Sequence, residues 1–365
     1  MTPSWARRLA AATLCLAVVL LPLSAHAQTD TVAAFDEVFR GWMRQEGVRR
    51  GVIAIAREGR VVHVTGFDLP ADAPVPVASL SKAVTAVCVA TLIQRGKLRF
   101  DTPLSRALAH TVGRFGPPAD PHLADVTIAQ LLTHRAGYQR VMTDPVTGTI
   151  LPNILRVHPA RDPAIDAQTR ELLRLRLPLA PGERYAYSNA PYLLLGAIVE
   201  ETTGLPYEDY CRSAVLAPAG APTASLTPDW RILSSYGGWQ FTAREYLRFH
   251  EVFGPRGPVL SDTTRQWMLA PDDKVAGGGA HYGLGALVRH AAGSYNVWHD
   301  GRWRYQLQRS ADTTLSVDYG SYVARLGEAG FSWFAYFEPS PPDRAVRELG
   351  RRMYKTGRES VKHWP

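Results

Sequence analysis

The chain has 365 residues, of which 46% are hydrophobic and 20% charged, and this composition excludes a mostly disordered protein. Glycine (30 residues) and proline (27 residues) occur at ordinary frequency, which excludes collagen-like and low-complexity proteins. The formal net charge of +8 comes mainly from arginines that alternate with acidic residues, as on a solvated surface. We expect no nucleic-acid partner, because the sequence contains no recognisable nucleic-acid-binding motif.

The first 27 residues have the pattern of a secretory signal peptide. Arg7 and Arg8 precede an apolar stretch from Leu9 to Leu23, and residues 25–27 (AHA) match an A-x-A cleavage site. The apolar stretch is shorter than the roughly 20 residues that a transmembrane helix needs, which favours a signal peptide that is cleaved. The alternative is that the segment stays uncleaved and anchors the protein in a membrane. We therefore expect an exported protein, periplasmic or secreted, whose mature chain begins at Gln28.

Cleavage would leave two cysteines, Cys88 and Cys211. Two thiols in an exported chain can pair, but sequence alone cannot show a pairing. Since Cys88 falls in a strongly apolar predicted helix, we expect both to be buried and unpaired. Basic residues gather in Arg344–Lys362, which favours the outer face of a C-terminal helix. Weak attraction to an anionic envelope surface is the alternative.

The first half of the chain begins with a helix and a hairpin. Apolar residues at helical spacing predict a helix over 35–43. Two short apolar runs, 52–56 and 61–65, predict a β-hairpin with its turn at 57–59. The segment 80–93 is apolar on nearly every side, which predicts a helix buried all round.

Helices dominate the middle of the chain, and strands return near its end. Capping boxes open helices at Thr127–Gln130 and Thr242–Glu245. The stretch 138–166 has four prolines and no periodicity, which is typical of a functional or mobile loop. Other helices are expected at 168–177, 191–203, 206–216 and from Pro341-Pro342 to about 354, and strands at 282–289, 295–298, 321–326 and 331–338.

This order of elements predicts an α+β fold. Strands from both ends of the chain would form one antiparallel sheet, flanked by helices, with an all-α region inserted between them. We expect the sheet region to comprise about residues 28–78 and 280–365, and the all-α region residues 79–279. No period of 20–50 residues repeats, which argues against a solenoid or propeller.

Ser79 and Lys82 are the first candidate catalytic residues. They form an S-x-x-K motif at the start of the buried helix, one turn apart on the same face. A serine hydroxyl needs a base to become a nucleophile, and a lysine whose pKa is lowered by burial can serve. The motif alone is weak, since a helix-capping serine beside an unrelated surface lysine gives the same letters.

Tyr187 and Asn189 form a second element, Y-S-N, after a polar turn. A tyrosine oxygen can carry a proton between nucleophile and leaving group. The asparagine amide offers a donor and an acceptor to a substrate amide or ester. Asn189 can equally cap the helix that begins near Pro191.

With these two elements together, the chain resembles the serine β-lactamase and penicillin-binding peptidase family, whose S-x-x-K pattern it carries. It is most similar to the class C-type branch, which includes esterases and D-amino-acid-specific peptidases and carries Y-x-N. The resemblance implies the β-lactamase/transpeptidase-like fold. It runs from about Val52 to Glu338 and rests on six blocks in the family's order: 77–82, 96–104, 131–137, 181–189, 237–244 and 282–285.

The family's third element, K-T-G or H-x-G on a strand facing the serine, has two matches. The literal K-T-G at 355–357 lies too close to the end of the chain and is interpreted as a decoy. His299 and Gly301 stand in the expected context. The resemblance implies that His299 supplies a hydrogen bond or proton and that Gly301 permits close substrate approach. It also implies an oxyanion hole from the backbone N–H groups of Ser79 and Arg302. A solvent-facing turn is the other interpretation of His299.

Two departures from the family pattern bear on the substrate. Asp300 stands where members that bind a substrate carboxylate usually have a hydroxyl, so it would repel that carboxylate unless Arg302 or Arg304 compensates. This favours an esterase or amidase over an efficient β-lactamase. The bulk of Arg302, Trp303 and Arg304 could narrow the site or indicate lost activity.

Other site classes lack their motifs. There is no H-E-x-x-H, G-x-S-x-G, Walker or G-x-G-x-x-G pattern, so no metal site, α/β-hydrolase or nucleotide site is predicted. His122 and His134 are expected to be structural. The aromatic residues Trp230, Tyr236 and Trp239 would line a pocket or pack in the core.

The sequence therefore predicts an exported serine hydrolase that forms an acyl-enzyme on Ser79 and needs no cofactor. Its substrates would be small esters, amides or D-amino-acid peptides of cell-wall type, entering past the 138–166 stretch. One alternative is a β-lactamase, and another is a non-catalytic envelope binding protein with the same fold. The oligomeric state cannot be inferred from the sequence.

Overall fold

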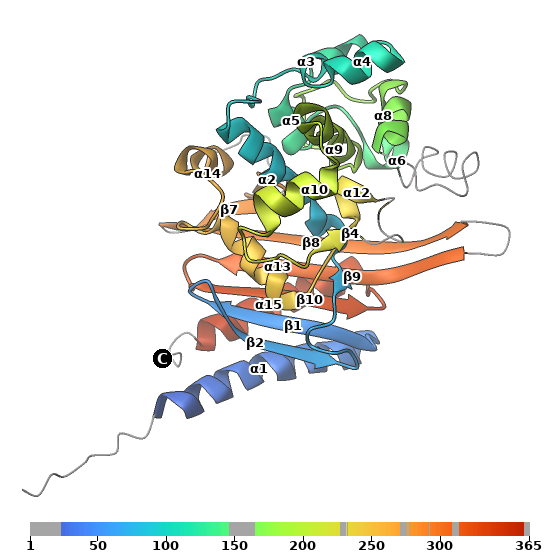
Figure 1. The fold of residues 1–365 in the computed structure, drawn as a ribbon. Helices are drawn as coiled ribbons and strands as arrows, with labels where there is room; N and C mark the ends of the chain where they lie inside the picture. The colour runs from blue at the N-terminus through green and yellow to red at the C-terminus, as the bar shows by residue number, and fades with distance from the viewer. Residues whose placement is uncertain are drawn as a thin grey trace, which may run out of the picture.

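A seven-stranded antiparallel sheet forms the centre of the molecule (Figure 1). The computed structural model describes residues 23–145, 165–226, 231, 233–270, 276, 278–291, 293–308 and 314–360. The strand order is β2-β1-β10-β9-β8-β7-β6, so the first hairpin pairs with the last strand. The strands are β1 (Arg50–Arg57), β2 (Arg60–Phe67), β6 (His281–Tyr282), β7 (Leu287–Ala291), β8 (Ser294–Gln308), β9 (Thr314–Leu326) and β10 (Phe331–Glu338).

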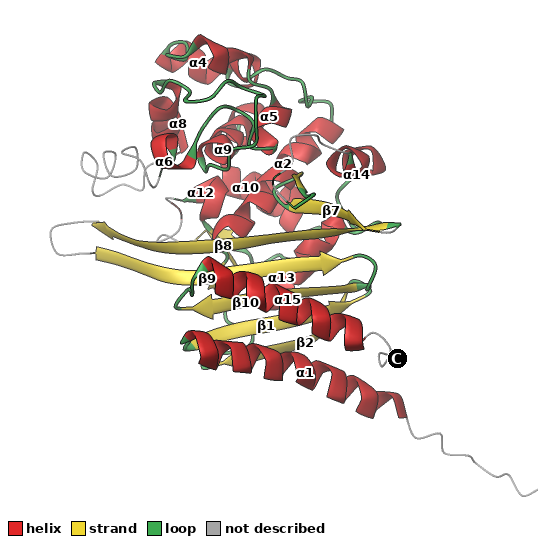
Figure 2. Cartoon of the chain, turned by 180° about the vertical axis from the view of Figure 1, so that it is seen from behind, coloured by secondary structure: helices red, strands yellow, loops and turns green. Residues whose placement is uncertain are grey.

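Two helices from the ends of the chain cover one face of this sheet (Figure 2). They are α1 (Leu23–Glu46) and α15 (Asp343–Ser360). The predicted apolar stripe of α1 is buried, with Phe35, Phe39 and Trp42 fully covered. Because this stripe packs against side chains of β1 and β10, the terminal helices and the sheet share one core.

The all-α region lies on the other face of the sheet (Figure 1). Its central helix, α2 (Ser81–Gln94), is buried on nearly every side, as its apolar sequence predicts. The helix α13 (Ala243–His250) packs on β1 and β10. The other helices are α3 (Leu104–Ala107), α4 (Ala109–Phe115), α5 (Ile128–Leu132), α6 (Arg140–Thr143), α8 (Ile165–Leu173), α9 (Ala190–Thr203), α10 (Tyr207–Cys211), α12 (Ser234–Gly237) and α14 (Asp262–Leu269).

A small second sheet borders the all-α region. It consists of β3 (Val75–Pro76), β5 (Trp239–Phe241) and β4 (Ser225–Leu226), in that order. The predicted α+β fold is thus confirmed, while the proposed boundaries of its two regions stay a prediction. Among the described helices, none is both long and apolar enough to cross a membrane.

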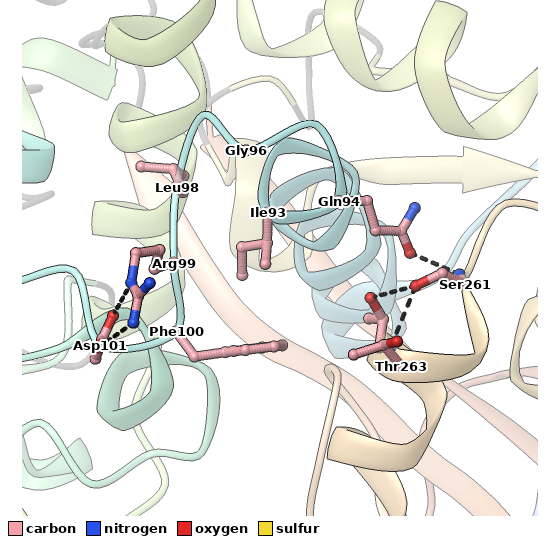
Figure 3. A pocket seen from close by; sticks show the side chains of 10 residues that line it. Ile93, Gln94, Gly96, Leu98, Arg99, Phe100, Asp101, Ser261 and Thr263 are labelled. Carbon is pink, nitrogen blue, oxygen red and sulfur yellow. Dashed lines mark hydrogen bonds and ion pairs between the residues drawn. The ribbon is translucent and has the colours of Figure 1, made fainter.

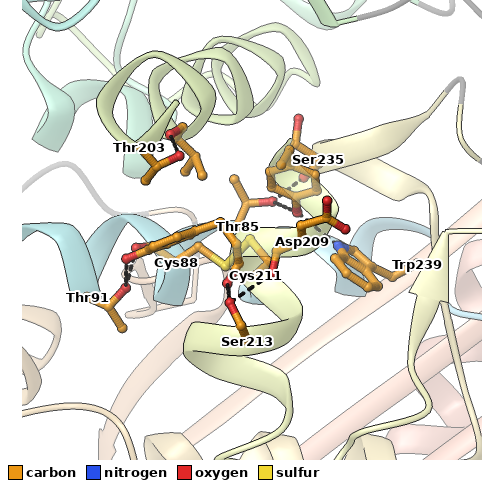
Figure 4. The surroundings of a disulfide bond; sticks show 12 residues. Thr85, Cys88, Thr91, Thr203, Asp209, Cys211, Ser213, Ser235 and Trp239 are labelled. Carbon is orange, nitrogen blue, oxygen red and sulfur yellow. Dashed lines mark hydrogen bonds between the residues drawn. A yellow bond between two sulfur atoms is a disulfide. The ribbon is translucent and has the colours of Figure 1, made fainter. Parts of the chain in front are cut away.

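The prediction that the two cysteines are unpaired is wrong. Cys88 on α2 and Cys211 on α10 are both fully buried, as expected, but they form a disulfide across 123 residues, with Cα atoms 5.6 Å apart (Figure 4). The packing of α10 against α2 brings the two side chains together. Nothing local in the sequence indicates that contact.

Local signals located most elements, with errors at their ends. The capping box at Thr127 is present, and Glu58 and Gly59 form the predicted hairpin turn with positive φ angles. At Thr242 only half of the predicted box forms: the Thr242 hydroxyl accepts from the Glu245 N–H, but the Glu245 side chain binds that hydroxyl instead of the Thr242 backbone N–H.

The predicted strand 282–289 is instead two short strands separated by a turn at residues 283–286. The strands β8 and β9 are much longer than predicted. Their outer halves carry the alternation of apolar residues that is typical of a strand, which the prediction missed: Trp303, Tyr305 and Leu307 in β8, and Leu315, Val317 and Tyr319 in β9.

Two predicted segments fall partly or wholly outside the described residues. These are residues 146–164 of the proline-containing stretch and residues 1–22 of the signal peptide. The K-T-G triplet at 355–357 lies within α15, on a helix instead of a strand facing Ser79. The interpretation of this triplet as a decoy agrees with that placement.

Candidate active site

Ser79 lies on a single 3-10 turn, η1 (Ala78–Leu80), immediately before α2. Its side chain is partly exposed, so a substrate can reach the hydroxyl. The preceding Ala78 has a φ of 49°, in the left-handed region that non-glycine residues rarely adopt. The turn is held in place by a hydrogen bond from Ser321 Oγ to Val77 O, 2.7 Å long. The sheet therefore fixes the serine against the N-terminal end of α2.

Lys82 is completely buried beside Ser79. Its Nζ lies 3.1 Å from Ser79 Oγ, 2.7 Å from Asn189 Oδ1 and 2.8 Å from the Tyr236 carbonyl oxygen. Burial lowers the pKa of Lys82 well below its ordinary value of 10.5, and the positive charge of Arg140 lowers it further. The negative charge of Asp144 acts in the opposite direction and raises this pKa.

In the structure Lys82 Nζ donates to all three oxygens, and the same contacts show how the amine would become a base once it loses a proton. The Asn189 side-chain oxygen and the Tyr236 carbonyl oxygen can only accept hydrogen bonds. An uncharged amine has two N–H groups, which these two acceptors occupy. The lone pair is then directed to the third neighbour, Ser79 Oγ, 3.1 Å away. Lys82 is thus placed to accept the Ser79 proton.

Tyr187 is the second polar group beside the nucleophile. Its side chain is hydrogen-bonded to that of Ser79, and its ring centroid lies 5.0 Å from Lys82 Nζ. Burial raises the pKa of Tyr187 above its ordinary value of 10, so the phenol stays protonated near neutral pH. A protonated Tyr187 can donate to Ser79 Oγ or to a leaving group, while the single Ser79 proton goes to Lys82.

Asn189 is oriented by a buried acid that the sequence analysis missed. The Asp144 carboxylate accepts one hydrogen bond from the backbone N–H of Asn189 (2.8 Å) and one from its side-chain amide (3.1 Å). These bonds turn the amide so that its oxygen faces Lys82. Asp144 follows α6 in the stretch 138–166, where an aspartate before a proline has the appearance of an ordinary turn residue.

His299 lies on β8 with both ring nitrogens engaged. Its Nε2 is 2.9 Å from the Tyr282 hydroxyl, and its Nδ1 contacts the backbone oxygen of Asp300. Burial and the nearby charge of Lys82 lower the pKa of His299 to about 3, so the ring is neutral at pH 7. Its ring centroid is 6.0 Å from that of Tyr187. A role of His299 in the reaction stays a prediction.

Gly301 packs directly against the nucleophile's backbone. A Cβ added there would lie 2.8 Å from Ser79 N and 2.9 Å from Val77 O, closer than real side chains approach. Arg302 is the next residue on β8, and an oxyanion hole formed by its backbone N–H and that of Ser79 stays a prediction. The Arg302 side chain points toward the start of α15, where its guanidinium forms an ion pair with Asp343 and donates a hydrogen bond to the backbone oxygen of Pro341.

The other histidines and aromatic side chains that the sequence analysis considered make contacts typical of structural residues. His134 is buried among tyrosine rings, and burial lowers its pKa far below the ordinary range. His122 is exposed and bonds to Asp120. Tyr236 and Trp239 are fully buried core residues, whereas Trp230 lies outside the described residues.

One pocket lies far from Ser79. It has a volume of about 620 Å³ and lies at the C-terminal end of α2, between Phe100 and the start of α14 (Figure 3). The 14 residues of α2 place it roughly 20 Å from the nucleophile. Within the described part of the chain, no group of three or more acidic, histidine or cysteine side chains could hold a metal ion.

Comparison with known proteins identifies the family of the chain. The sequence profile described as Beta-lactamase matches residues 35–354. The chain belongs to the Beta-lactamase family. The match covers most of the chain and confirms the resemblance inferred from its motifs.

Two relatives of known name are an esterase and a D-aminopeptidase. Esterase EstB from Burkholderia gladioli is 30% identical over 204 residues, which cover 52% of this chain and 50% of the esterase. A D-aminopeptidase from Brucella canis is 26% identical over 338 residues, which cover 81% of this chain and 61% of that protein. The chain therefore spans less than two thirds of the length of either relative.

Solved structures share the fold at low sequence identity. EstCE1, described as a hydrolase with promiscuous acyltransferase activity, has a TM-score of 0.70 and 18% identity, covering 90% of this chain and 100% of its own. The D-amino acid amidase from Ochrobactrum anthropi SV3 has a TM-score of 0.68 and 17% identity, covering 91% of this chain and 99% of its own. At these identities the likeness establishes the fold alone.

Proposed function

We propose that this chain is a serine hydrolase that works through an acyl-enzyme on Ser79. The main support is the fully buried Lys82 amine, which lies 3.1 Å from a partly exposed serine hydroxyl and has a lowered pKa. An amine that loses its proton more readily than an ordinary lysine can act as a general base, and arginine could not replace it.

The proposed reaction has two halves. Ser79 Oγ attacks a carbonyl carbon while Lys82, assisted by Tyr187, takes the hydroxyl proton. The backbone N–H groups of Ser79 and Arg302 stabilise the oxyanion, aided by the N-terminal end of α2. The proton passes through Tyr187 to the leaving group, the carbonyl–leaving-group bond breaks, and an ester to Ser79 remains. Water then hydrolyses that ester by the reverse proton path.

We propose small esters, amides and D-amino-acid peptides of cell-wall type as substrates. The names of the relatives, an esterase and a D-aminopeptidase, support this range. Asn189 would bind the substrate amide or ester with the part of its amide group that Lys82 and Asp144 leave free. We propose that substrates reach Ser79 past α6. This route is supported by Arg140 on α6, whose guanidinium carbon lies 5.9 Å from the ring centroid of Tyr187, a neighbour of Ser79.

Export belongs to the same proposal. The apolar leader with its A-x-A site supports it, and so does the disulfide, because disulfides persist mainly in oxidising compartments. N-terminal sequencing of the protein from a periplasmic or culture fraction should start at Gln28. Recovery of the whole chain from the cytoplasm alone would contradict export.

A fluorophosphonate probe tests the hydrolase proposal without knowledge of the substrate. Intact-mass analysis should show one adduct on the wild type and none on Ser79→Ala. The control Ser105→Ala, on α3, should be labelled like the wild type. Absence of an adduct on the folded wild type would refute the proposal and favour the non-catalytic binding protein.

A further inference from the structure

One of the carbonyls that accept from Lys82 belongs to α12, a helix of only four residues. The helix begins at Ser234, whose φ of 38° lies in the left-handed region that non-glycine residues rarely adopt. The Tyr236 carbonyl oxygen lies 2.8 Å from Lys82 Nζ, so the amine keeps its orientation only while α12 keeps its place. The placement of the proposed base therefore depends on what holds α12.

Thr85 holds α12 from the face of α2 that carries Lys82. The two residues are three apart on α2, so their side chains lie on the same side of the helix. Thr85 is fully buried, and its hydroxyl donates to the Ser235 carbonyl oxygen (Figure 4). The Ser81 carbonyl oxygen, on the same helix as Thr85, is farther away at 3.5 Å. Two side chains of α2 thus bind two successive carbonyls of α12.

A chain of hydrogen bonds orients the Thr85 hydroxyl. Trp239 Nε1 can only donate, and it donates to the Tyr207 hydroxyl oxygen at 2.9 Å. Burial raises the pKa of Tyr207 above its ordinary value of 10, so the phenol keeps its proton and donates it to Thr85 Oγ1, 2.7 Å away. The Thr85 proton then goes to the Ser235 carbonyl oxygen, which can only accept. The chain of bonds runs in one direction and ends on α12.

A second threonine–tyrosine pair joins α2 and α10 less than two helical turns farther along. Thr91 on α2 and Tyr210 on α10 are linked by a bond of 2.9 Å between their hydroxyl groups. The Thr91 hydroxyl is also buried, and it donates to the Cys88 carbonyl oxygen of its own helix. The two pairs therefore differ in their acceptor, which is a carbonyl of α2 for Thr91 and a carbonyl of α12 for Thr85.

We propose that Thr85 is a positioning residue for the general base. Its hydroxyl keeps the carbonyls of α12 in place, and the Tyr236 carbonyl in turn directs the Lys82 amine toward the nucleophile. Tyr207 and Trp239 act one step behind, because they orient the Thr85 hydroxyl. This inference rests on the proposed function, because it assigns a support to the base of the same reaction.

Thr85→Val tests the proposal, because valine has the shape of threonine without the hydroxyl. The rate constant of fluorophosphonate labelling at Ser79 is measured from about pH 5 to 9, together with urea unfolding. We expect the maximal rate to fall about tenfold, because a displaced amine takes the proton less efficiently. The acid limb should move to lower pH, because a carbonyl dipole that favours the ammonium is displaced from the amine. Thr85→Ser, which keeps the hydroxyl, should restore most of the rate and the wild-type limb.

A shift of the limb in Thr85→Val would report the placement of Lys82, because the charged groups that act on its pKa, Arg140 and Asp144, are unchanged. The other titratable groups near Lys82 also remain, and they are Tyr187, Tyr192, His134 and His299.

Thr91→Val is the matched control. It removes the same group from the same helix, so the loss of stability should be similar, but the labelling rate and the limb should stay at wild-type values. If Thr85→Val does not fold, Tyr207→Phe and Tyr210→Phe form a second matched pair, of which only Tyr207→Phe should slow labelling and move the limb. Equal labelling in the two members of a pair, or an unmoved limb in Thr85→Val, would refute the inference. Absence of labelling in the folded wild type would instead refute the proposed function.

Discussion

Replacing Asp144 by asparagine should shift the acid limb of the pH–rate profile to lower pH. Protonated Lys82 cannot accept the Ser79 proton, so activity should rise with pH as Lys82 loses its proton through its lowered pKa. The Asp144 carboxylate raises that pKa, because it favours the charged ammonium. Removing the negative charge therefore lowers the pKa of Lys82 further, and the acid limb should follow it.

The hydrogen bonds in the site give the size of the shift. Asn189 separates the two charges, with contacts of 2.7 Å to Lys82 and 3.1 Å to Asp144. At a separation of roughly 7 Å and an effective dielectric constant of about 20, Coulomb's law gives about 2 kcal/mol, or between one and two pKa units. The maximal rate should also fall, because an amide in place of the Asp144 carboxylate has a single oxygen and can no longer accept from both donors of Asn189 in the same way.

The rate of phosphonate labelling between about pH 5 and 9 measures this limb without a substrate assay. Glu245→Gln is a control of the same kind, because Glu245 is also a buried acid that accepts hydrogen bonds from one backbone N–H, of Thr223, and from the side chains of Thr223 and Thr242. It should leave the limb in place. An Asp144→Asn limb that stays unmoved, or that moves to higher pH, would show that the assigned coupling between Asp144 and Lys82 is wrong.

Three further predictions concern the site and its support. Gly301→Ala should slow labelling by about 10²–10³-fold, because the new Cβ displaces β8 from Ser79 N; near-normal labelling would argue against an oxyanion hole there. Lys82→Arg should slow labelling by about 10²–10⁴-fold, since guanidinium cannot accept the proton, and equal activity would eliminate lysine as the base. Replacing both Cys88 and Cys211 by serine should destabilise the protein by about 2–5 kcal/mol in urea unfolding, whereas unchanged stability would contradict a structural role for the disulfide.

Residues close together in the sequence determined much of this protein. The Ser79–Lys82 pair is set by helical spacing, because residues three apart share a helix face. The hairpin turn at Glu58 and Gly59 and the capping box at Thr127 are likewise local, and each is present as predicted. The resemblance of six sequence blocks to the family then predicted how these local elements combine into one fold.

Tertiary structure decided what the local signals could not. The proposed role of Lys82 as a base depends on Asn189 and Tyr236, 107 and 154 residues away, which place hydrogen-bond acceptors around its buried amine. Asp144 lies 45 residues from the amide that it orients, within a stretch that has no periodic pattern. The disulfide depends in the same way on which elements pack together. Burial and long-range contacts arise when helices and strands assemble, so they leave no trace in the spacing of neighbouring residues.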